Sequence, residues 1–318
     1  MSIKYSVIVV SVFLLASTEG WGQTFNNLVV DSNPGAQSET SIAVAPSGSD
    51  TLMATWNDFS NDTYSQPGYS FSTDSGVTWS SPAILTQGLN STDYEGGFDP
   101  SCSISQSGYE YYTFVNKYTN LPSTYPSGYD LGAVVMEYSK NNGQSWSGPY
   151  PVSGSPYEDK PYMTVDNSPS SSYRGDVYIA YTDWSNSTVQ YLQNNLNIAS
   201  SSTHGGSWQT RAVYSTSLVN TAVMGGIPAV GPHGGVYVAY YIGSQSTGGS
   251  GSIDIVKSTN GGASFSSPVT AVNNFIDLYE DNFGNLRVSS FPTLVVDPVS
   301  GYVDDAPFSV EIPKAEFI

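Results

Sequence analysis

Cysteine, histidine and basic residues are scarce in this chain of 318 residues. It contains one cysteine and two histidines, and 9 lysines and arginines stand against 27 aspartates and glutamates, for a net charge of −18. A single cysteine, Cys102, cannot form an intramolecular disulfide, and we expect it to be a small buried core residue. A catalytic Cys–His pair is not expected, because His204 and His233 both lie in Gly-rich turns. The shortage of clustered Lys and Arg argues against binding to nucleic acid or to anionic membrane surfaces.

Long apolar runs and helical periodicity are also lacking, with one exception at the N-terminus. Lys4 precedes a short apolar run from Val7 to Ala16, and small residues follow. This order predicts a signal peptide over residues 1–22. We therefore expect a secreted or cell-surface protein made of residues 23–318, with no stable membrane insertion after cleavage. An uncleaved anchor is the alternative.

The sequence does contain a repeated eight-residue turn. The stretch STDSGVTW begins at Ser72 and recurs as SKNNGQSW from Ser139, SSTHGGSW from Ser201 and STNGGASF from Ser258. Each copy has serine first, glycine fifth and an aromatic residue eighth, and successive aromatic positions are 67, 62 and 57 residues apart. A motif that returns at one place in each unit is typical of a repeat architecture.

Short alternating apolar runs, separated by Gly, Ser and Pro turns, fill the sequence between these copies. TSIAVAP, PSCSISQ, PYMTVDN, IPAVGP and FPTLVVDP open successive units, and runs such as TLMATWND and DVYIAYTD follow. Four strands in each unit predict an all-β fold, a β-propeller of four-stranded antiparallel blades. A β-sandwich would also have many short strands, but it would not repeat the turn. We expect four complete blades at about residues 38–90, 97–155, 158–218 and 224–275, and a partial fifth at 287–318.

The Ser-x-Asp-x-Gly-x-x-Trp turns resemble the Asp-box, or BNR, repeats of the sialidase superfamily. The resemblance spans about Ser38 to Val303 and implies a sialidase-like propeller. Sialidases have more blades than this chain provides, so either the ring is smaller or, as we favour, the chain is truncated. Asp-boxes also occur in propellers without catalytic activity, so the resemblance indicates the fold more than the activity.

The repeated turns themselves are expected to be structural. Glycine adopts the positive φ that tight turns often require, the first and third side chains can accept backbone N–H groups, and the aromatic ring can pack between blades. Thr203 takes the place of the acidic third residue in one copy, and a carboxylate needed for catalysis could not be replaced in this way. A weak metal site at Asp74 is the alternative to a structural role. The structural set is Ser72, Asp74, Gly76, Trp79, Ser139, Asn141, Gly143, Trp146, Ser201, Gly205, Trp208, Ser258, Asn260, Gly262 and Phe265.

A ligand is expected at the opposite face, as in sialidase-like propellers. The resemblance implies that this face is formed by the loops that enter the innermost strands and by the loops that follow the second strands. Carboxylates at this face suit a glycosidase, a cation site or a binder of polar sugars, and the rings of Trp56 and Trp184 are suited to stacking on sugars. For any one of these charged residues, the alternative is that it is merely solvated and binds no ligand. The ligand-binding candidates are Glu39, Asp159, Lys160, Asp183, Trp184 and Arg287.

The elements that define a sialidase are incomplete in this chain. Sialidases grip the carboxylate of the substrate with three arginines, because a guanidinium binds a carboxylate bidentately. In place of the first, which stands in an Arg-Ile-Pro motif, the chain has Glu39, whose charge opposes a carboxylate. The chain contains only Arg174, Arg211 and Arg287, and of these only Arg287 precedes an innermost strand. We expect Arg174 on the face of the repeated turns, opposite the expected ligand-binding face.

Hydrolysis through carboxylates is the alternative to binding. The catalytic candidates are Asp58, Asp99 and Glu158, with Tyr279 as a nucleophile. The loop EDNFGN, residues 280–285, offers oxygen ligands to calcium but lacks the alternating spacing of a calcium loop, so no cofactor is expected.

The function that the sequence favours is binding of an extracellular glycan or other cell-surface material by the loops at one end of the propeller. A glycoside hydrolase, either sialidase-like or working through two carboxylates, and a structural or adhesion module are the alternatives.

Overall fold

The computed structural model describes residues 28–46, 48–60, 64–85, 94–118, 132–187, 193–216, 221–244, 249–276, 290–296 and 308–311. The predicted signal peptide, the EDNFGN loop, Tyr279 and Arg287 lie outside these residues. No helix in the described ranges is long and apolar enough to cross a membrane.

The described residues form antiparallel β-sheets and no α-helix, which confirms the predicted all-β class. The first sheet has the order β1 (Gln37–Val44), β2 (Leu52–Asp58), β3 (Gln66–Ser72) and β4 (Ala83–Ile84). A later sheet has the order β13 (Thr221–Val230), β14 (Val236–Ser244), β15 (Ser250–Ser258) and β16 (Val269–Ile276), with the 3₁₀ helix η1 (Pro232–Gly234) between β13 and β14.

An eight-stranded sheet lies between these two in the sequence. Its first half is β5 (Tyr94–Ile104), β6 (Glu110–Tyr118), β7 (Gly132–Ser139) and β8 (Ser147–Pro151). Its second half is β9 (Glu158–Val165), β10 (Val177–Asp183), β11 (Asn195–Ser201) and β12 (Gln209–Ser215). The halves are joined where Gly132 of β7 pairs with Glu158 of β9. A final pair, β17 (Thr293–Val296) and β18 (Phe308–Glu311), ends the described chain.

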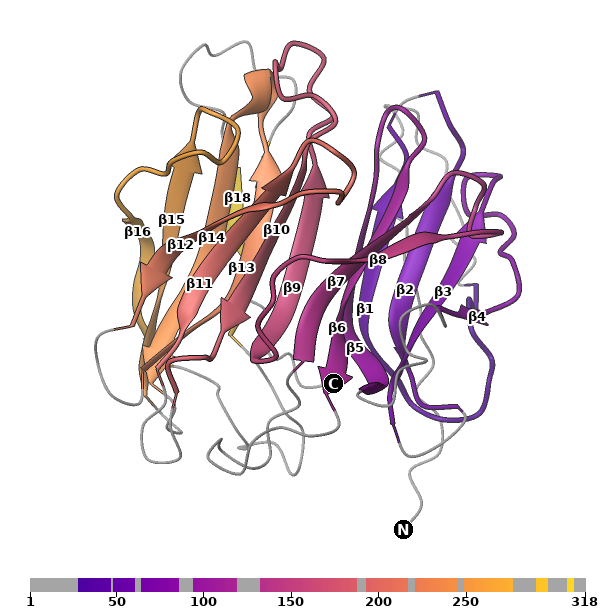
Figure 1. The fold of residues 1–318 in the computed structure, drawn as a ribbon, viewed down its shortest axis with the longest axis horizontal. Helices are drawn as coiled ribbons and strands as arrows, with labels where there is room; N and C mark the ends of the chain where they lie inside the picture. Colours follow the sequence, from indigo (N-terminus) through magenta and orange to yellow (C-terminus); the bar gives the residue numbers. More distant parts are fainter. Residues whose placement is uncertain are drawn as a thin grey trace, which may run out of the picture.

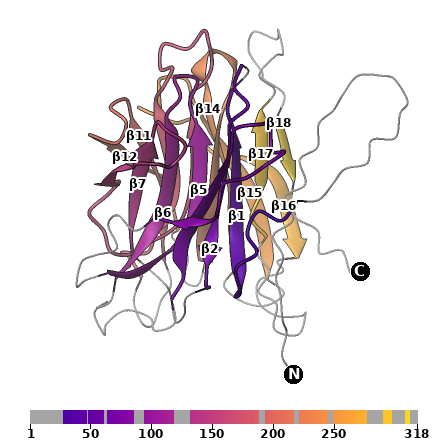
Figure 2. The ribbon, with the colours of Figure 1, turned by 90° about the vertical axis from the view of Figure 1, so that its right-hand side faces the viewer.

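The first strands of successive groups lie against one another. β1 contacts β5, β5 contacts β9, β9 contacts β13, and β13 contacts β17. Side chains connect them: the Oγ of Ser41 accepts a hydrogen bond from the N–H of Cys102 at 3.3 Å, and the Oγ of Ser101 accepts one from the N–H of Met163 at 3.1 Å. In Figure 1 the sheets accordingly stand next to one another, from β1–β4 at the right to β13–β16 at the left. Figure 2 shows β17 and β18 at one side of the molecule.

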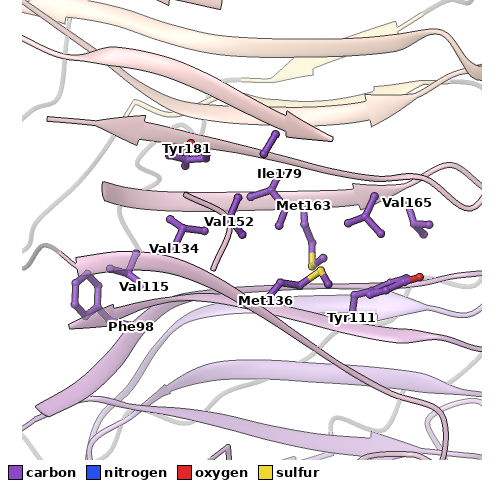
Figure 3. Packing of buried hydrophobic residues seen from close by; sticks show 12 residues of the cluster. Phe98, Tyr111, Val115, Val134, Met136, Val152, Met163, Val165, Ile179 and Tyr181 are labelled. Atoms are coloured by element: carbon purple, nitrogen blue, oxygen red, sulfur yellow. The ribbon is translucent and has the colours of Figure 1, made fainter. Parts of the chain in front are cut away.

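Apolar side chains between neighbouring sheets form the core. β2 is buried at every position, as expected for a strand covered on both faces. Between the two halves of the large sheet, Met136 of β7 and Met163 of β9 reach toward one another, and Tyr111 packs beside them (Figure 3). Cys102 is buried in the neighbouring cluster, where burial raises the pKa of its thiol to about 11, so it is the inert core residue that the sequence predicts.

Each copy of the repeated turn closes with the same hydrogen bonds. In the first, the Oγ of Ser72 accepts the N–H groups of Gly76 at 2.8 Å and Asp74 at 3.3 Å, and Asp74 Oδ1 accepts the N–H of Thr78 at 2.8 Å. The other copies repeat this pattern, with serine accepting from glycine at 2.9–3.0 Å: Ser139 from Gly143, Ser201 from Gly205 and Ser258 from Gly262. The glycines all have positive φ. These side chains are therefore occupied in holding the turns.

The aromatic residues of the repeated turns are half-buried and pack against the core clusters. Trp79 lies against Trp56 and Val30, and Trp146 lies edge-on to Tyr69 of the preceding sheet, with ring centroids 5.2 Å apart. Trp208 and Phe265 join the next two core clusters.

Candidate functional site

The repeated turns define one end of the sheets, and the candidate residues lie at the other. Val44 pairs with Leu52, which pairs with Ser72 beside the first repeated turn; we call this the hairpin end. Gln37 pairs with Asp58 at the opposite end, where β1, β5, β9 and β13 begin. We call that the bulged end, for the feature described next.

Four of the first strands carry a β-bulge near their start. The register shifts lie between Ser38 and Ser41 in β1 and between Phe98 and Ser101 in β5, and equivalent shifts occur in the pairings of β9 and β13. A residue of positive φ stands within each: Glu39 at 53°, Asp99 at 56°, Lys160 at 49° and Gly225 at 61°. A left-handed backbone is unusual for residues other than glycine and often marks a functional position.

Three of these residues form one ion-paired cluster. Lys160 Nζ lies 2.6 Å from Glu39 Oε1 and 2.5 Å from Asp99 Oδ1. The backbone N–H of Lys160 also donates to Asp99 Oδ2 at 3.2 Å. The side chain of Asp99 is 6% exposed and that of Lys160 13%, whereas that of Glu39 is 36% exposed. The cluster thus presents Glu39 to solvent above a largely buried ion pair.

Asn57 of β2 supports the cluster from below. Its Nδ2 donates to Glu39 Oε2 at 3.0 Å, and its Oδ1 accepts the backbone N–H of Asp99 at 3.0 Å. Since Asn57 is itself buried, it fixes both acidic residues relative to the first sheet.

The cluster shifts the protonation of its members. Burial, together with neighbouring Asp99, raises the pKa of Glu39 to about 7 against the lowering effect of Lys160. Burial also raises the pKa of Asp99, while the charge of Lys160 lowers it. Burial by itself would lower the pKa of Lys160, but Asp99 and Glu39 outweigh it, and this pKa is raised. Lys160 therefore stays charged, and Glu39 is the carboxyl group that exchanges a proton near neutral pH.

At the fourth bulge an aromatic ring takes the place of a charged side chain. A Cβ atom on Gly225 would lie 2.5 Å from Cγ of Phe291, so the glycine makes room for that ring. Phe291 is half-buried, and its ring centroid lies 6.5 Å from that of Tyr241. The bulged end thus combines a charged cluster with a partly exposed ring.

Two predicted catalytic carboxylates are buried and already bonded to the protein. Glu158 is 1% exposed; its Oε2 accepts the backbone N–H of Val134 at 2.7 Å, and its Oε1 accepts the hydroxyl of Ser153. Asp58 is 3% exposed and accepts from Trp56 Nε1 at 3.2 Å and from Ser60. Neither carboxylate can reach a substrate in this structure. In this structure Glu158 and Asp58 brace the strands, and the catalytic role predicted for them stays a prediction.

The tryptophans predicted to stack on sugars are also buried. Trp56 and Trp184 are each 1% exposed, and Trp184 Nε1 donates to Asp159 Oδ2 at 3.3 Å. Trp56 packs with Val30 and Ala54, and Trp184 packs in the cluster of β13 and β14, so neither ring is exposed for stacking on a sugar in this structure. Asp183, at the end of β10, is half-buried and accepts the N–H of Ser185 at 2.9 Å.

No group of three or more His, Cys, Asp or Glu side chains able to hold a metal ion occurs among the residues that the structure describes. The carboxylate oxygens of Asp74 accept hydrogen bonds from Thr78 and Ser72 within the turn, and these bonds lower its pKa.

Comparison with known proteins relates this architecture to solved structures only. The sequence matches no protein-family model and no curated protein. Among solved structures, an α-L-arabinanase of Penicillium chrysogenum complexed with arabinobiose is 16% identical, with a TM-score of 0.54 over 87% of this chain and 75% of that one. A GH93 α-L-arabinofuranosidase of Fusarium graminearum, with arabinobiose, is 14% identical, with a TM-score of 0.54 over 87% and 74%. The chain has a β-propeller fold.

A sialidase is similar at a lower level. Hadza microbial sialidase Hz136 is 15% identical, with a TM-score of 0.51, and the match covers 83% of this chain but only 50% of the sialidase. At such identities the similarity establishes the fold alone. The propeller spans about half of the sialidase's length.

Sequence reasoning missed two residues of the propeller's bulged end. Asn57 lies within a strand that reads as core, and its contacts depend on the neighbouring first strand. Phe291 stands five residues before the last residue of β17, as Glu39, Asp99, Lys160 and Gly225 do in β1, β5, β9 and β13. Counting back from the strand ends would have found it.

Proposed function

We propose that this propeller binds a neutral saccharide at its bulged end. One observation carries the proposal: equivalent bulges on three first strands bring Glu39, Asp99 and Lys160 into a single cluster, with Glu39 exposed above it. A left-handed conformation at three non-glycine residues costs free energy, which supports a role other than packing. Charged and amide groups at the same end of the propeller as an aromatic ring, here Phe291, offer the kinds of contact that sugar hydroxyls and sugar faces require.

The charge of the site favours a neutral ligand. Glu39 stands where a carboxylate ligand would need a cation, and Lys160 is already paired with two carboxylates. The net charge of −18 also opposes an anion. Two of the similar propellers were solved with arabinobiose, a neutral disaccharide, and this makes arabino-oligosaccharides the first ligands to test.

Binding is favoured over hydrolysis because Lys160 engages both carboxylates at once. A general acid must be free to give its proton to a leaving group, and a nucleophile must be free to attack. In the cluster the accessible oxygens of Glu39 and Asp99 are both directed at the same nitrogen.

Calorimetric titration with a panel of neutral oligosaccharides, beginning with arabinobiose, tests the proposal. We expect binding by the wild-type chain and a loss of about ten-fold in affinity for Glu39→Gln, the size expected for one charge-assisted hydrogen bond. Asp74→Asn is the control, since it lies at the hairpin end and asparagine occupies the same position in two other turns. No binding across the panel, or equal loss in both variants, contradicts the proposal.

Hydrolysis is the second candidate, and a different observation favours it. Glu39 and Asp99 are adjacent carboxyl groups, and Glu39 has a pKa of about 7, so Glu39 can take up or release a proton near neutral pH beside a second carboxyl group. Such a pair is the minimal equipment of a glycosidase. Release of 4-nitrophenol from arabinofuranoside, xyloside and sialoside substrates, abolished by Asp99→Asn but not by Asp74→Asn, would replace binding with hydrolysis.

We further propose that the repeated turns are Asp-boxes and that the protein is secreted. The shared hydrogen bonds of the four turns support the first proposal. The short apolar run after Lys4 supports the second.

A further inference from the structure

A second cavity lies at the hairpin end of the propeller, away from the site proposed above. It has a volume of about 320 Å³, is open to solvent on one side, and is lined by the hairpin between β5 and β6 and the hairpin between β9 and β10. Its size falls at the lower end of the range of ligand pockets, about 300–1,000 Å³, and suits one sugar ring.

The floor of this cavity is rigid and its polar groups are occupied. Asp166 is fully buried; its Oδ1 accepts the N–H of Ser168 at 2.8 Å and its Oδ2 the hydroxyl of Ser171 at 2.5 Å. Asn167 joins the two hairpins, because its Oδ1 accepts the N–H of Gln106 at 2.7 Å and its Nδ2 donates to the carbonyl of Ile104 at 2.9 Å. A ligand would therefore meet a preformed surface.

The rim supplies an unpaired cation. Arg174 lines the cavity, is exposed and makes no ion pair or ring contact with any residue that the structure describes. The lysines of the described ranges are engaged: Lys160 in its cluster, and Lys117, Lys140 and Lys257 over tyrosine rings. Arg211 is the other arginine of these ranges, and it lies on β12, away from the cavity.

We propose that this cavity binds the carboxylate of an acidic sugar, a hexuronate, through Arg174. The guanidinium provides a planar pair of donors that matches a carboxylate, and exposed Gln106 beside it adds an amide. The sugar hydroxyls would lie over the floor formed by Asn167 and Asp166.

Two carboxylates near the cavity limit the affinity. The carboxylate of Asp166 is occupied by hydrogen bonds, and that of Asp176, at the end of the hairpin, does not line the cavity. Together with the net charge of −18 they oppose an anion, so the Kd for a single sugar is expected in the millimolar range.

Titration followed by calorimetry or by NMR, with methyl β-D-glucuronoside and methyl β-D-glucoside as a matched pair of ligands, tests this proposal. The wild-type chain should bind the glucuronoside at least about ten-fold more tightly than the glucoside, because the two differ in one charge-assisted contact. Arg174→Gln should remove this difference and Arg174→Lys should retain part of it. Arg211→Gln, which removes the same charge elsewhere, should leave binding unchanged.

Glu39→Gln separates this site from the one at the bulged end, and it should not affect glucuronoside binding. Binding that survives Arg174→Gln, binding lost equally in Arg211→Gln, or sulfate binding as tight as that of the glucuronoside would each overturn the proposal. Since Arg174 is exposed, thermal unfolding monitored by circular dichroism should show all variants folded.

Discussion

The Nζ atom of Lys160 lies 2.5 Å from Oδ1 of Asp99, a residue 61 positions earlier in the chain. Both residues stand in β-bulges with left-handed backbones, on the first strands of neighbouring groups. The same nitrogen contacts Glu39 of the first sheet at 2.6 Å. One lysine therefore connects three groups of strands at the end of the propeller where they begin.

Substituting Lys160 by methionine should destabilise the protein. The change leaves Asp99, which is 6% exposed, without its counter-charge, and breaking a buried ion pair in this way costs about 3–5 kcal/mol. Chemical denaturation at pH 7.5 measures the loss. Lys257→Met, which removes a contact over the ring of Tyr237, should cost less than about 1 kcal/mol.

A second substitution shows whether the loss comes from the unpaired charge. Asp99→Asn in the Lys160→Met background should recover part of the stability, because the buried carboxylate is then neutral. Equal stability of the single and double variants would mean that the ion pair is not the source of the loss.

Glu137 should make stability fall as the pH rises. Its side chain is fully buried on β7, neither carboxylate oxygen has a hydrogen-bond partner among the described residues, and burial raises its pKa to about 8. The folded state thus holds a proton that the unfolded state loses near pH 4.5. Below pH 4.5 Glu137 therefore does not lower the free energy of unfolding. As the pH rises from there to about 8, it lowers this free energy increasingly.

Glu137→Gln removes this dependence while keeping the shape of the side chain. The variant should match the wild type near pH 4.5 and exceed it by roughly 2 kcal/mol or more above pH 8. Unfolding free energies measured across this range test the difference. The curve of the variant still has a slope, because Glu158 also has a pKa of about 8. Parallel curves for the two proteins would refute the assignment.

In the third repeated turn, serine at the first position should matter more than threonine at the third. Ser201 is 3% exposed, and its Oγ accepts the N–H of Gly205 at 2.9 Å and of Thr203 at 3.3 Å. Ser201→Ala leaves these donors without an acceptor and should cost about 1–2 kcal/mol. Thr203→Asn introduces the residue that two other turns use at this position, so its effect should stay within about 0.5 kcal/mol. Denaturant midpoints compare the two.

The repeated turns were predictable because their hydrogen bonds are local. The serine, its glycine partner and the third residue lie within five positions, so the spacing in the sequence carries the geometry. The spacing of these motifs also indicates where each group of strands begins and ends, and this predicts the all-β class. The burial of Trp184 was not predictable in this way, since it depends on β13 and β14, which lie further along the chain.

The candidate site was predictable only in part for the same reason. Placing charged residues at the starts of first strands needed only the order of strands, and Glu39, Asp99 and Lys160 do meet there. That Glu158 is closed off by Val134 and Ser153 depends on the junction of β7 and β9, which no local pattern signals. Positive φ at non-glycine residues leaves no mark in the sequence either.

Gly225→Ala tests the fourth bulge, where the glycine and the ring of Phe291 share one space. The new Cβ would meet Phe291 Cγ at 2.5 Å, and φ is +61°. The ring must move, so we expect a loss of about 1–3 kcal/mol and weaker saccharide binding. In a Phe291→Ala background only the backbone cost remains, which gives a coupling of about 1 kcal/mol or more between the two positions. Gly154→Ala, where nothing lies within 4 Å, should be nearly neutral. If the losses of Gly225→Ala and Phe291→Ala simply add, the ring does not depend on the glycine, and the aromatic part of the proposed site loses its support.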